Sequence, residues 1–297
     1  MSDILELLRE FGEVECDIPL STMTTLRIGG PASYVVYPED SVSLDALMNV
    51  ITKHKMAYKV IGKGSNLLCS DKPFHGVVIR LDRFDHYFFM EDTLVAQAGC
   101  SIIALAYQAM RNGLSGLEFA SGIPATVGGV TFMNAGAYRS SISDVIDGVF
   151  IYRNGKYEWL DNRDCEFGYR SSIFQRHPDW IIAAVRIRLS PSDTSEIREL
   201  MESRRERRMN SQPLNYPSAG SVFRNPDDIP AWKLIEGIGF RGKRIGDAMV
   251  SEKHVNFIVN AGNASAEDFL TLVNEIKDQV EQKYQVRLHM EVEKFNW

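Results

Sequence analysis

The sequence predicts an α+β protein of three units, and three observations lead to that prediction. The chain has 297 residues, more than one hydrophobic core usually holds. Helix and strand patterns alternate along it in three groups. Two glycine-rich segments, residues 62–67 and 121–138, interrupt the first two groups. We expect units at residues 1–82, 83–208 and 209–297, with a last strand that can return to the first region.

Composition narrows the class of protein. Hydrophobic residues make up 44% and charged residues 24%, as in a soluble globular protein. A net charge of −6 without a long basic tract argues against nucleic acid as a partner. The chain shows neither a signal peptide nor an apolar run long enough to span a membrane, so we expect a cytoplasmic protein, with a monomer favoured. The four cysteines are scattered, which fits reduced thiols, and no metal site is expected.

The first group reads as a βαβ-like unit. A short amphipathic helix is expected near the N-terminus, followed by a strand at 33–37. The next helix places Leu44, Leu47, Met48 and Ile51 on one face. Strands at 58–61 and 77–81 complete the unit, and the segment 82–92 reads as its boundary.

The second and third groups mix helices and strands in the same way. The second has strands at 94–98, 149–152, 156–160 and 180–189 and a helix at 101–112, and a helix capped by Ser195 follows it through Arg208. The third has a helix at 231–236, a strand at 255–259, a helix with a Ser265–Asp268 capping box and a strand at 286–292. We interpret this third unit as the substrate domain.

The first glycine segment, Gly62-Lys-Gly-Ser-Asn-Leu67, follows a predicted strand and could form a nest of backbone N–H groups for a phosphate. It has neither the Gly-Lys-Ser/Thr of a Walker loop nor the third glycine of a Rossmann fingerprint. Taken alone, a two-glycine turn is more often only a turn.

The second glycine segment, residues 121–138, is the centre of the prediction. Pro124 suits the first position of a helix, yet Gly128 and Gly129 lie inside that helix, where each costs about 1 kcal/mol relative to Ala. Such a pair calls for close approach of a ligand or of another backbone. Read alone, the segment leaves both explanations open. If a cofactor is the reason, a side chain at Gly128 should block it.

Five ordered motifs together resemble a known family. They are Gly62-Lys-Gly-Ser-Asn-Leu67, Gly122-Ile-Pro-Ala-Thr-Val-Gly-Gly129 with Asn134-Ala-Gly136, Tyr169-Arg170-x-Ser172, Gly220-Ser-Val-Phe-x-Asn-Pro226 and Glu291-Val292. In this order they resemble the UDP-N-acetylenolpyruvoylglucosamine reductase (MurB) family, in its shorter type II form. The likeness begins near Thr24 and runs to the C-terminus.

The resemblance implies a two-part FAD-binding region of the PCMH type, as in FAD-linked oxidases, followed by an α/β substrate-binding domain. It implies non-covalent FAD, since neither glycine segment contains His, and NADPH as the hydride donor. The residues expected to bind FAD lie in the two segments: Gly62, Lys63, Gly64, Ser65, Asn66, Leu67, Ser121, Ile123, Thr126, Gly128, Gly129, Asn134 and Gly136.

The same resemblance implies the chemistry, which is reduction of the enolpyruvyl group of UDP-N-acetylglucosamine enolpyruvate to give UDP-N-acetylmuramate for peptidoglycan synthesis. Catalysis would fall to Arg170 and Glu291 at the developing charge and to Ser221 as proton donor. Substrate contacts are expected from Tyr169, Arg208, Arg224 and Asn225. Arg224 stands where the family often has Lys.

Three alternatives remain open at the level of the sequence. The chain could be an FAD-linked oxidase or dehydrogenase of an alcohol or sugar, although Ser221 and Glu291 would then be unexplained. It could also be a nucleotide-sugar binding protein without turnover. Within the Glu- and Arg-rich helix 195–208, a solvated surface is the competing reading to a diphosphate contact by Arg208 or Arg204.

Overall fold

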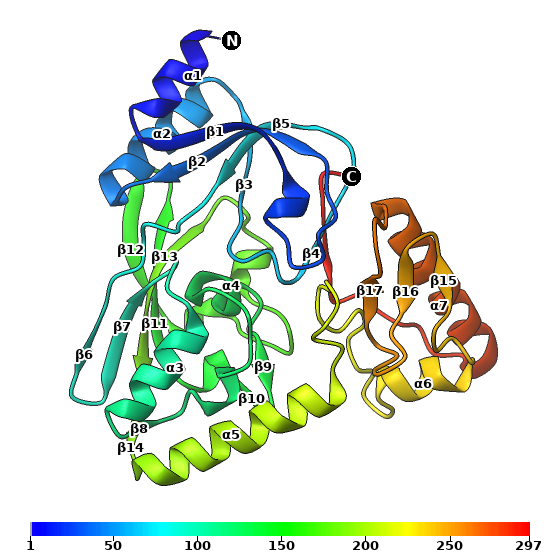
Figure 1. Cartoon of the computed structure of the whole chain (residues 1–297). Helices are drawn as coiled ribbons and strands as arrows, with labels where there is room; N and C mark the ends of the chain where they lie inside the picture. Colours follow the sequence, from blue (N-terminus) through cyan, green and yellow to red (C-terminus); the bar gives the residue numbers. More distant parts are fainter. Residues whose placement is uncertain (1) are drawn as a thin grey trace. The chain divides into compact units, whose positions relative to one another are not determined.

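The computed structural model describes residues 2–297 and divides them into two compact units (Figure 1). The first unit runs to Cys16 and continues in Tyr34–Lys63 and Gly76–Arg207. The second contains Asp17–Ser33, Gly64–His75 and Arg208–Trp297. Each unit has its own buried apolar cluster. The three-part division predicted from the sequence differs from this one, because residues 17–33 and 64–75 belong to the second unit. We keep the three-part division as a proposal.

The first unit begins with α1 (Ser2–Arg9) and a four-stranded sheet. Its strand order is β1 (Gly12–Pro19), β2 (Pro31–Pro38), β5 (Phe74–Ile79) and β3 (Ala57–Val60), with β3 parallel to β5. The helix α2 (Ser41–Lys53) is capped by Asp40, whose carboxylate accepts from the Ser43 N–H at 2.8 Å. Its buried face is the predicted one: Leu44, Leu47, Met48 and Ile51.

A five-stranded antiparallel sheet forms the larger part of the first unit. Its order is β12 (Lys156–Asp161), β11 (Ile146–Arg153), β13 (Ile181–Arg188), β7 (Thr93–Gln97) and β6 (Tyr87–Met90). The helix α3 (Ile102–Arg111) lies within the predicted range 101–112 and is capped by Ser101. The segment 82–92, expected as a boundary, contributes the edge strand β6.

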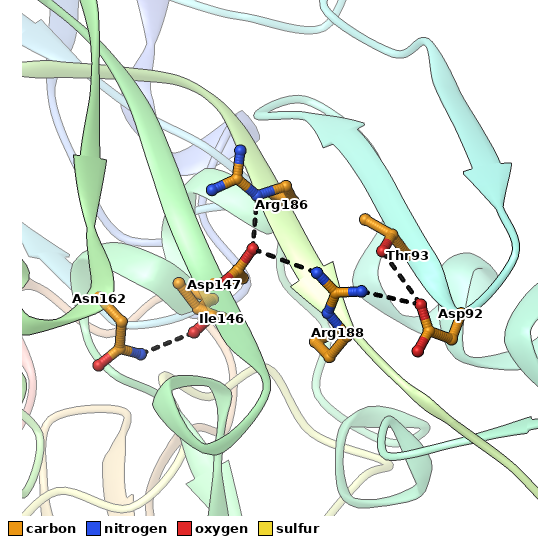
Figure 2. A network of polar contacts seen from close by, with 7 residues as sticks. All are labelled: Asp92, Thr93, Ile146, Asp147, Asn162, Arg186 and Arg188. Atoms are coloured by element: carbon orange, nitrogen blue, oxygen red, sulfur yellow. Dashed lines mark hydrogen bonds and ion pairs between the residues drawn. The ribbon is translucent and has the colours of Figure 1, made fainter.

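Charged side chains bridge the strands of this sheet (Figure 2). The Arg186 Nε donates to the Asp147 carboxylate at 2.6 Å, and Arg188 contacts both Asp147 at 3.7 Å and Asp92 at 2.9 Å. The Arg186 guanidinium also lies 5.1 Å from the centre of the Trp159 ring. These side chains are 35–57% exposed, so each pair stabilises the sheet by about 1 kcal/mol at most. The network belongs to the scaffold.

The second unit packs helices on a three-stranded antiparallel sheet. Its strands are β15 (Arg244–Ile245), β16 (Ala248–Val250) and β17 (Ile258–Asn260). The helix α7 (Ala266–Tyr284) contacts β15, β16 and α6 (Ala231–Gly237). The predicted Ser265–Asp268 capping box is confirmed, and the buried face of α7 includes Phe269, Leu272, Val273, Ile276 and Val280.

The chain ends in a strand that pairs far back in the sequence. The predicted strand at 286–292 is wrong, since those residues make only an isolated bridge between Met290 and Phe223. The strand β18 (Glu293–Phe295) comes directly after and pairs in parallel with β4 (Leu67–Cys69). The alternation of apolar residues at 286–292 therefore marks a connection that buries Leu288 and Val292 and exposes Arg287 and His289 without forming a strand.

The remaining elements are short, except for α5 (Thr194–Ser211). Ser195 is not its cap, because the Asp193 carboxylate accepts from the N–H groups of Ser195 at 2.8 Å and Glu196 at 3.3 Å. The others are α4 (Val127–Phe132), β8 (Leu114–Ser115), β9 (Gly136–Ala137), β10 (Ser140–Ser141) and β14 (Ser190–Pro191), with 3-10 turns at Leu20–Thr22, Glu118–Ala120, Ile142–Asp144, Asn162–Cys165 and Ile173–Gln175. Within residues 2–297, no helix has the length and apolarity that a membrane crossing needs.

Candidate active site

The two glycine segments meet in the first unit. Thr126 caps α4, and its Oγ1 accepts from the Gly129 N–H at 3.2 Å, so the helix begins after Thr126 and the predicted start at Pro124 is wrong. A side-chain carbon at Gly62 would lie 2.6 Å from the same Thr126 Oγ1. Gly62 is therefore required by the approach of the second segment. This contact joins the residues that the sequence assigns to one cofactor.

The glycines of the second segment are explained by different physical causes. A side-chain carbon at Gly128 would lie 3.1 Å from Ala98 Cβ, and the Gly128 N–H donates to the Ala98 carbonyl at 2.9 Å. A side-chain carbon at Gly136 would collide with the Ser140 carbonyl. At Gly129 it would meet only Thr126 Oγ1, at 3.4 Å. Gly128 and Gly136 are thus explained by backbone packing, and Gly129 is the position with open space beside it.

The rest of the first segment lies in the second unit. Gly64 has a left-handed φ of +61°, and a side-chain carbon there would collide with the Met23 carbonyl. The Asn66 amide donates to the Glu291 carbonyl at 3.2 Å, and the Asn66 carbonyl accepts from Glu293 N–H at 2.9 Å. Lys63 is exposed, Ser65 is half-buried, and Leu67 is buried at the start of β4. Asn66 therefore positions the segment that carries Glu291.

A third loop holds Tyr169 and Arg170 against the second glycine segment. Arg170 has φ +53°, a conformation that non-glycine residues rarely adopt, and its Nη2 donates to the Gly136 carbonyl at 2.7 Å. Asn134, only 4% exposed, donates to the Gly168 carbonyl at 2.8 Å and accepts from Ser143 N–H at 3.1 Å. Its amide thus fixes this loop. Tyr169 is 56% exposed.

Two further residues of the predicted cofactor set lie just before α4. Ser121 is buried, and its hydroxyl donates to the Glu118 carbonyl at 2.8 Å. Ile123 is half-buried and its N–H donates to the Ala120 carbonyl at 3.0 Å. Both hydrogen bonds join these residues to the neighbouring 3-10 turn at Glu118–Ala120.

Ser221 and Glu291 come together in the second unit although 70 positions separate them in the numbering (291 − 221). The Glu291 N–H donates to the carbonyl of Val222, the residue after Ser221, at 2.7 Å. Both residues are half-buried. Their segments lie side by side, which brings the predicted proton donor and the predicted carboxyl group into one part of the second unit. Arg170, the other predicted catalytic residue, belongs to the first unit.

Arg224 and Asn225 extend the same segment. The Arg224 N–H donates to the His289 carbonyl at 2.9 Å, while its side-chain Nε is buried without a hydrogen-bond partner among residues 2–297. A buried guanidinium donor left unpaired is costly, which suits a residue that pairs with an anionic ligand. Asn225 instead accepts the Ala231 N–H at 3.1 Å and so caps α6.

A pocket of about 620 Å³ in the second unit adjoins the end of α5. Arg208 directly precedes one lining residue, Met209, and the Lys253 Nζ donates to the Met209 carbonyl at 2.5 Å. The sequence analysis did not identify the residues that line this pocket, because they form no motif. Only the Pro- and Asn-rich stretch after α5 indicated a loop there. The lining residues are Met209, Pro213, Leu214, Asn215, Tyr216, Met249, Ser251, Glu252 and Lys253.

His254 directly follows the lining residue Lys253, and its protonation affects the stability of the second unit. Its Nδ1 accepts from the Asn256 N–H at 3.3 Å, and burial holds the pKa of the imidazole below 6.5. The unfolded chain therefore takes up a proton first as the pH falls, which favours unfolding. We expect the unfolding free energy of the second unit to fall below pH 6.5 by up to about 1.4 kcal/mol per pH unit.

Urea unfolding at several pH values measures this effect. His254→Gln should flatten the dependence on pH, whereas the matched variant His289→Gln, at an exposed position, should keep it. An unchanged slope in His254→Gln would show that other groups cause the loss.

Comparisons with known proteins agree with this geometry. Residues 212–295 match the family model described as the C-terminal domain of UDP-N-acetylenolpyruvoylglucosamine reductase, and residues 32–161 match an FAD binding domain. The chain is 41% identical to the UDP-N-acetylenolpyruvoylglucosamine reductase of Bacillus subtilis (strain 168) over 96% of this chain and 95% of that protein. It is 42% identical to reductase 1 of Bacillus cereus (strain ATCC 14579), over 96% and 95%.

Solved structures show the same relationship. The crystal structure of the MurB enzyme from Thermus caldophilus matches with a TM-score of 0.84 at 35% identity, over 96% of this chain and all of that chain. A glucose dehydrogenase, Phl p 4.0202, shares the fold over 65% of this chain and 44% of its own, with a TM-score of 0.51 at 15% identity. The predicted fold class, an FAD-binding region followed by a MurB-type C-terminal domain, is confirmed, and the chain belongs to the UDP-N-acetylenolpyruvoylglucosamine reductase family.

Proposed function

We propose that this protein reduces UDP-N-acetylglucosamine enolpyruvate to UDP-N-acetylmuramate, with FAD bound non-covalently and NADPH as the hydride donor. Membership of the family supports the reaction. One observation carries it at the level of residues: Ser221 and Glu291 lie on adjacent backbone segments, joined through the 2.7 Å bond between Glu291 N–H and the Val222 carbonyl. The proposal places the enzyme in the cytoplasm as a monomer that supplies a peptidoglycan precursor.

The residues of the first unit fit FAD. Gly62 and Thr126 meet without a side chain between them, and Gly129 leaves open space at the N-terminal end of α4. A small, glycine-lined surface lets a flat, elongated ligand approach the backbone closely. In the proposed complex Gly62, Thr126 and Gly129 contact FAD directly, while Gly128, Gly136 and Asn134 shape its site through backbone contacts. When bound, FAD supplies the hydride that it has taken from NADPH.

In the proposed reaction, side chains of the protein stabilise the negative charge that develops on the substrate and supply the proton. Hydride addition at the enolpyruvyl CH₂ leaves negative charge on the adjacent carbon and on the carboxylate. A guanidinium from Arg170 and a protonated carboxyl group from Glu291 would stabilise that charge as it develops. The Ser221 Oγ then donates its proton to the carbon, which completes the lactyl ether, and the serine recovers a proton from solvent.

Substrate binding is proposed for the polar groups around the second unit. The unpaired Nε of Arg224 favours an anionic part of the nucleotide-sugar. Arg208, at the end of α5, is placed at the diphosphate, and Tyr169 at the enolpyruvyl side. Asn225 contributes through its cap on α6, which fixes the segment after Arg224.

A coupled assay tests the function. We expect the purified protein to release FAD on denaturation and to oxidise NADPH beyond a single turnover only when the enolpyruvyl substrate is present. Oxidation of an alcohol or sugar instead would identify an FAD-linked oxidase or dehydrogenase. Binding of the nucleotide-sugar without NADPH oxidation would identify a binding protein. A colourless protein that cannot be reconstituted with FAD would contradict the proposal.

Two neighbouring glycines separate packing from cofactor binding. Gly128→Leu should lower the unfolding free energy of the flavin-free protein by about 1–3 kcal/mol or more, because the new side chain would press against Ala98. Gly129→Ala should leave that stability equal or raise it by up to about 1 kcal/mol, since Ala favours the helix and its methyl has room.

FAD titration of the same two variants tests whether Gly129 lies in the cofactor site. Gly129→Ala should weaken FAD binding despite its intact stability, because its methyl would enter the space proposed for the cofactor. Wild-type affinity for FAD in Gly129→Ala would remove Gly129 from the cofactor site.

A further inference from the structure

The segment that carries Ser221 is fixed on only one side by its immediate neighbours. On the N-terminal side, Gly220 has a left-handed φ of +78°, and a side-chain carbon there would meet nothing within 4 Å. In that direction Ala219 is buried, and the first backbone hydrogen bond among the described residues is that of Ser218, whose N–H donates to the Thr25 carbonyl at 3.1 Å. On the C-terminal side, Val222 and Phe223 are buried and hydrogen-bonded. The orientation of Ser221 therefore depends on what holds Val222 and Phe223.

Asn256 holds both of these residues. It is 4% exposed, and its carbonyl accepts from Val222 N–H at 2.8 Å. Its side-chain amide accepts from Phe223 N–H at 3.0 Å and donates to the Phe223 carbonyl at 2.9 Å. One side chain thus satisfies both backbone groups of Phe223, as a neighbouring strand would. No other residue type of this size offers a donor and an acceptor together in that geometry except Asp in its protonated form.

The opposite edge of the same segment carries Glu291. The Glu291 N–H donates to the Val222 carbonyl at 2.7 Å, and Arg224 N–H donates to the His289 carbonyl at 2.9 Å. The segment 222–224 is consequently held between Asn256 on one edge and residues 289–291 on the other. A shift at Asn256 would move Ser221 and would change its placement relative to Glu291.

We propose that Asn256 is a positioning residue for the proton-transfer step, which it serves by fixing the backbone that orients Ser221 toward the substrate carbon. This rests on the function proposed above, in which Ser221 donates the proton. The Asn256 side chain is hydrogen-bonded to the backbone of Phe223, and in the proposed mechanism it does not contact the reacting atoms. Its own position is set from the other side, because Asn256 N–H donates to His254 Nδ1 at 3.3 Å.

The test compares two buried asparagines of the second unit. Asn260 is 5% exposed, and its side chain also bonds only to backbone: Nδ2 donates to the Leu26 carbonyl at 3.2 Å, and Oδ1 accepts from Ala264 N–H at 3.0 Å. Asn256→Ala and Asn260→Ala should therefore lose similar stability. Each half-reaction is followed by stopped flow on FAD-loaded protein, with rates normalised to bound flavin.

We expect reduction of the flavin by NADPH to be unchanged in both variants. Reoxidation by the enolpyruvyl substrate should slow about 10- to 100-fold in Asn256→Ala alone, since small misplacements of a catalytic group have effects of this size. In a Ser221→Ala background, adding Asn256→Ala should slow reoxidation no further, because the group that it positions is already absent.

Three results would overturn the proposal. They are equal slowing of both half-reactions, equal slowing of reoxidation in Asn260→Ala, and a full further loss in the double variant. Failure of the underlying function looks different, because the parent protein would then not be reoxidised by the substrate, or Ser221→Ala would match the parent. If Asn256→Ala is too unstable to hold FAD, Asn256→Asp assayed across pH replaces it. Its reoxidation rate should rise toward the parent's at low pH, where the protonated carboxyl group regains the donor, and a flat profile would count against the proposal.

Discussion

Ser221→Ala should leave reduction of the flavin by NADPH intact and should slow its reoxidation by the enolpyruvyl substrate by about 10²- to 10⁴-fold. The reason is that Ser221 acts only after hydride has reached the substrate. Stopped-flow measurement of the two half-reactions checks this separation. Ser218→Ala is the matched control, because the hydrogen bonds of Ser218 to Thr25 are made by its backbone.

The hydrogen bonds next to Ser221 determine how the result of this experiment is interpreted. The Ser221 segment is held through the backbone of Val222 and Phe223, so removing the hydroxyl should not disturb the fold. Equal losses in both half-reactions would therefore point to damage elsewhere. An unchanged second half-reaction would exclude Ser221 as the proton donor.

Arg170→Ala should slow the substrate half-reaction by about 10²- to 10³-fold, the usual cost of removing a group that stabilises a developing anion. Ala and Arg meet the same backbone cost at φ +53°, so the comparison reports on the side chain. Arg170→Lys should recover part of the rate, since it restores the charge without the planar fork.

Arg176→Ala controls for general loss of charge near this loop, because Arg176 is exposed and paired with Glu166. The Arg170 Nη2 also donates to the Gly136 carbonyl, which gives the side chain a structural role. If the structural role dominates, Arg170→Ala should release FAD and lose both half-reactions together. Retained FAD with a selective loss of the second half-reaction is the result that we expect.

The elements set by local patterns were predictable from the sequence. The helix at 41–53 and the capping box at Ser265 depend on nearby residues alone, and both form as expected. The strand expected at 286–292 failed because period-2 patterning reports burial, whereas a ladder also needs a partner of sufficient length. The sequence alone does not show which distant strand a segment such as 286–292 would pair with.

The candidate site shows the same limit. Motif order indicated Ser221 and Glu291, but only the fold shows that Glu291 N–H is bonded to the carbonyl of Val222, the residue after Ser221. The sequence left two reasons for Gly128 open, because it does not show that Ala98 lies against that helix. Asn256 escaped notice because a lone Asn between apolar residues carries no signal until its backbone partners at 222–223 are known.

The pairing of β18 with β4 has a consequence for biosynthesis. The second unit draws on residues 17–33 and 64–75, made early, and on 208–297, made last. During translation β4 must wait for almost the whole chain before Glu293–Phe295 can pair with it. Contacts between such distant residues form slowly and leave apolar edges exposed in the meantime. The ribosome-bound protein should therefore complete its first unit before the unit that carries Ser221, and that second unit is where we expect chaperones to bind.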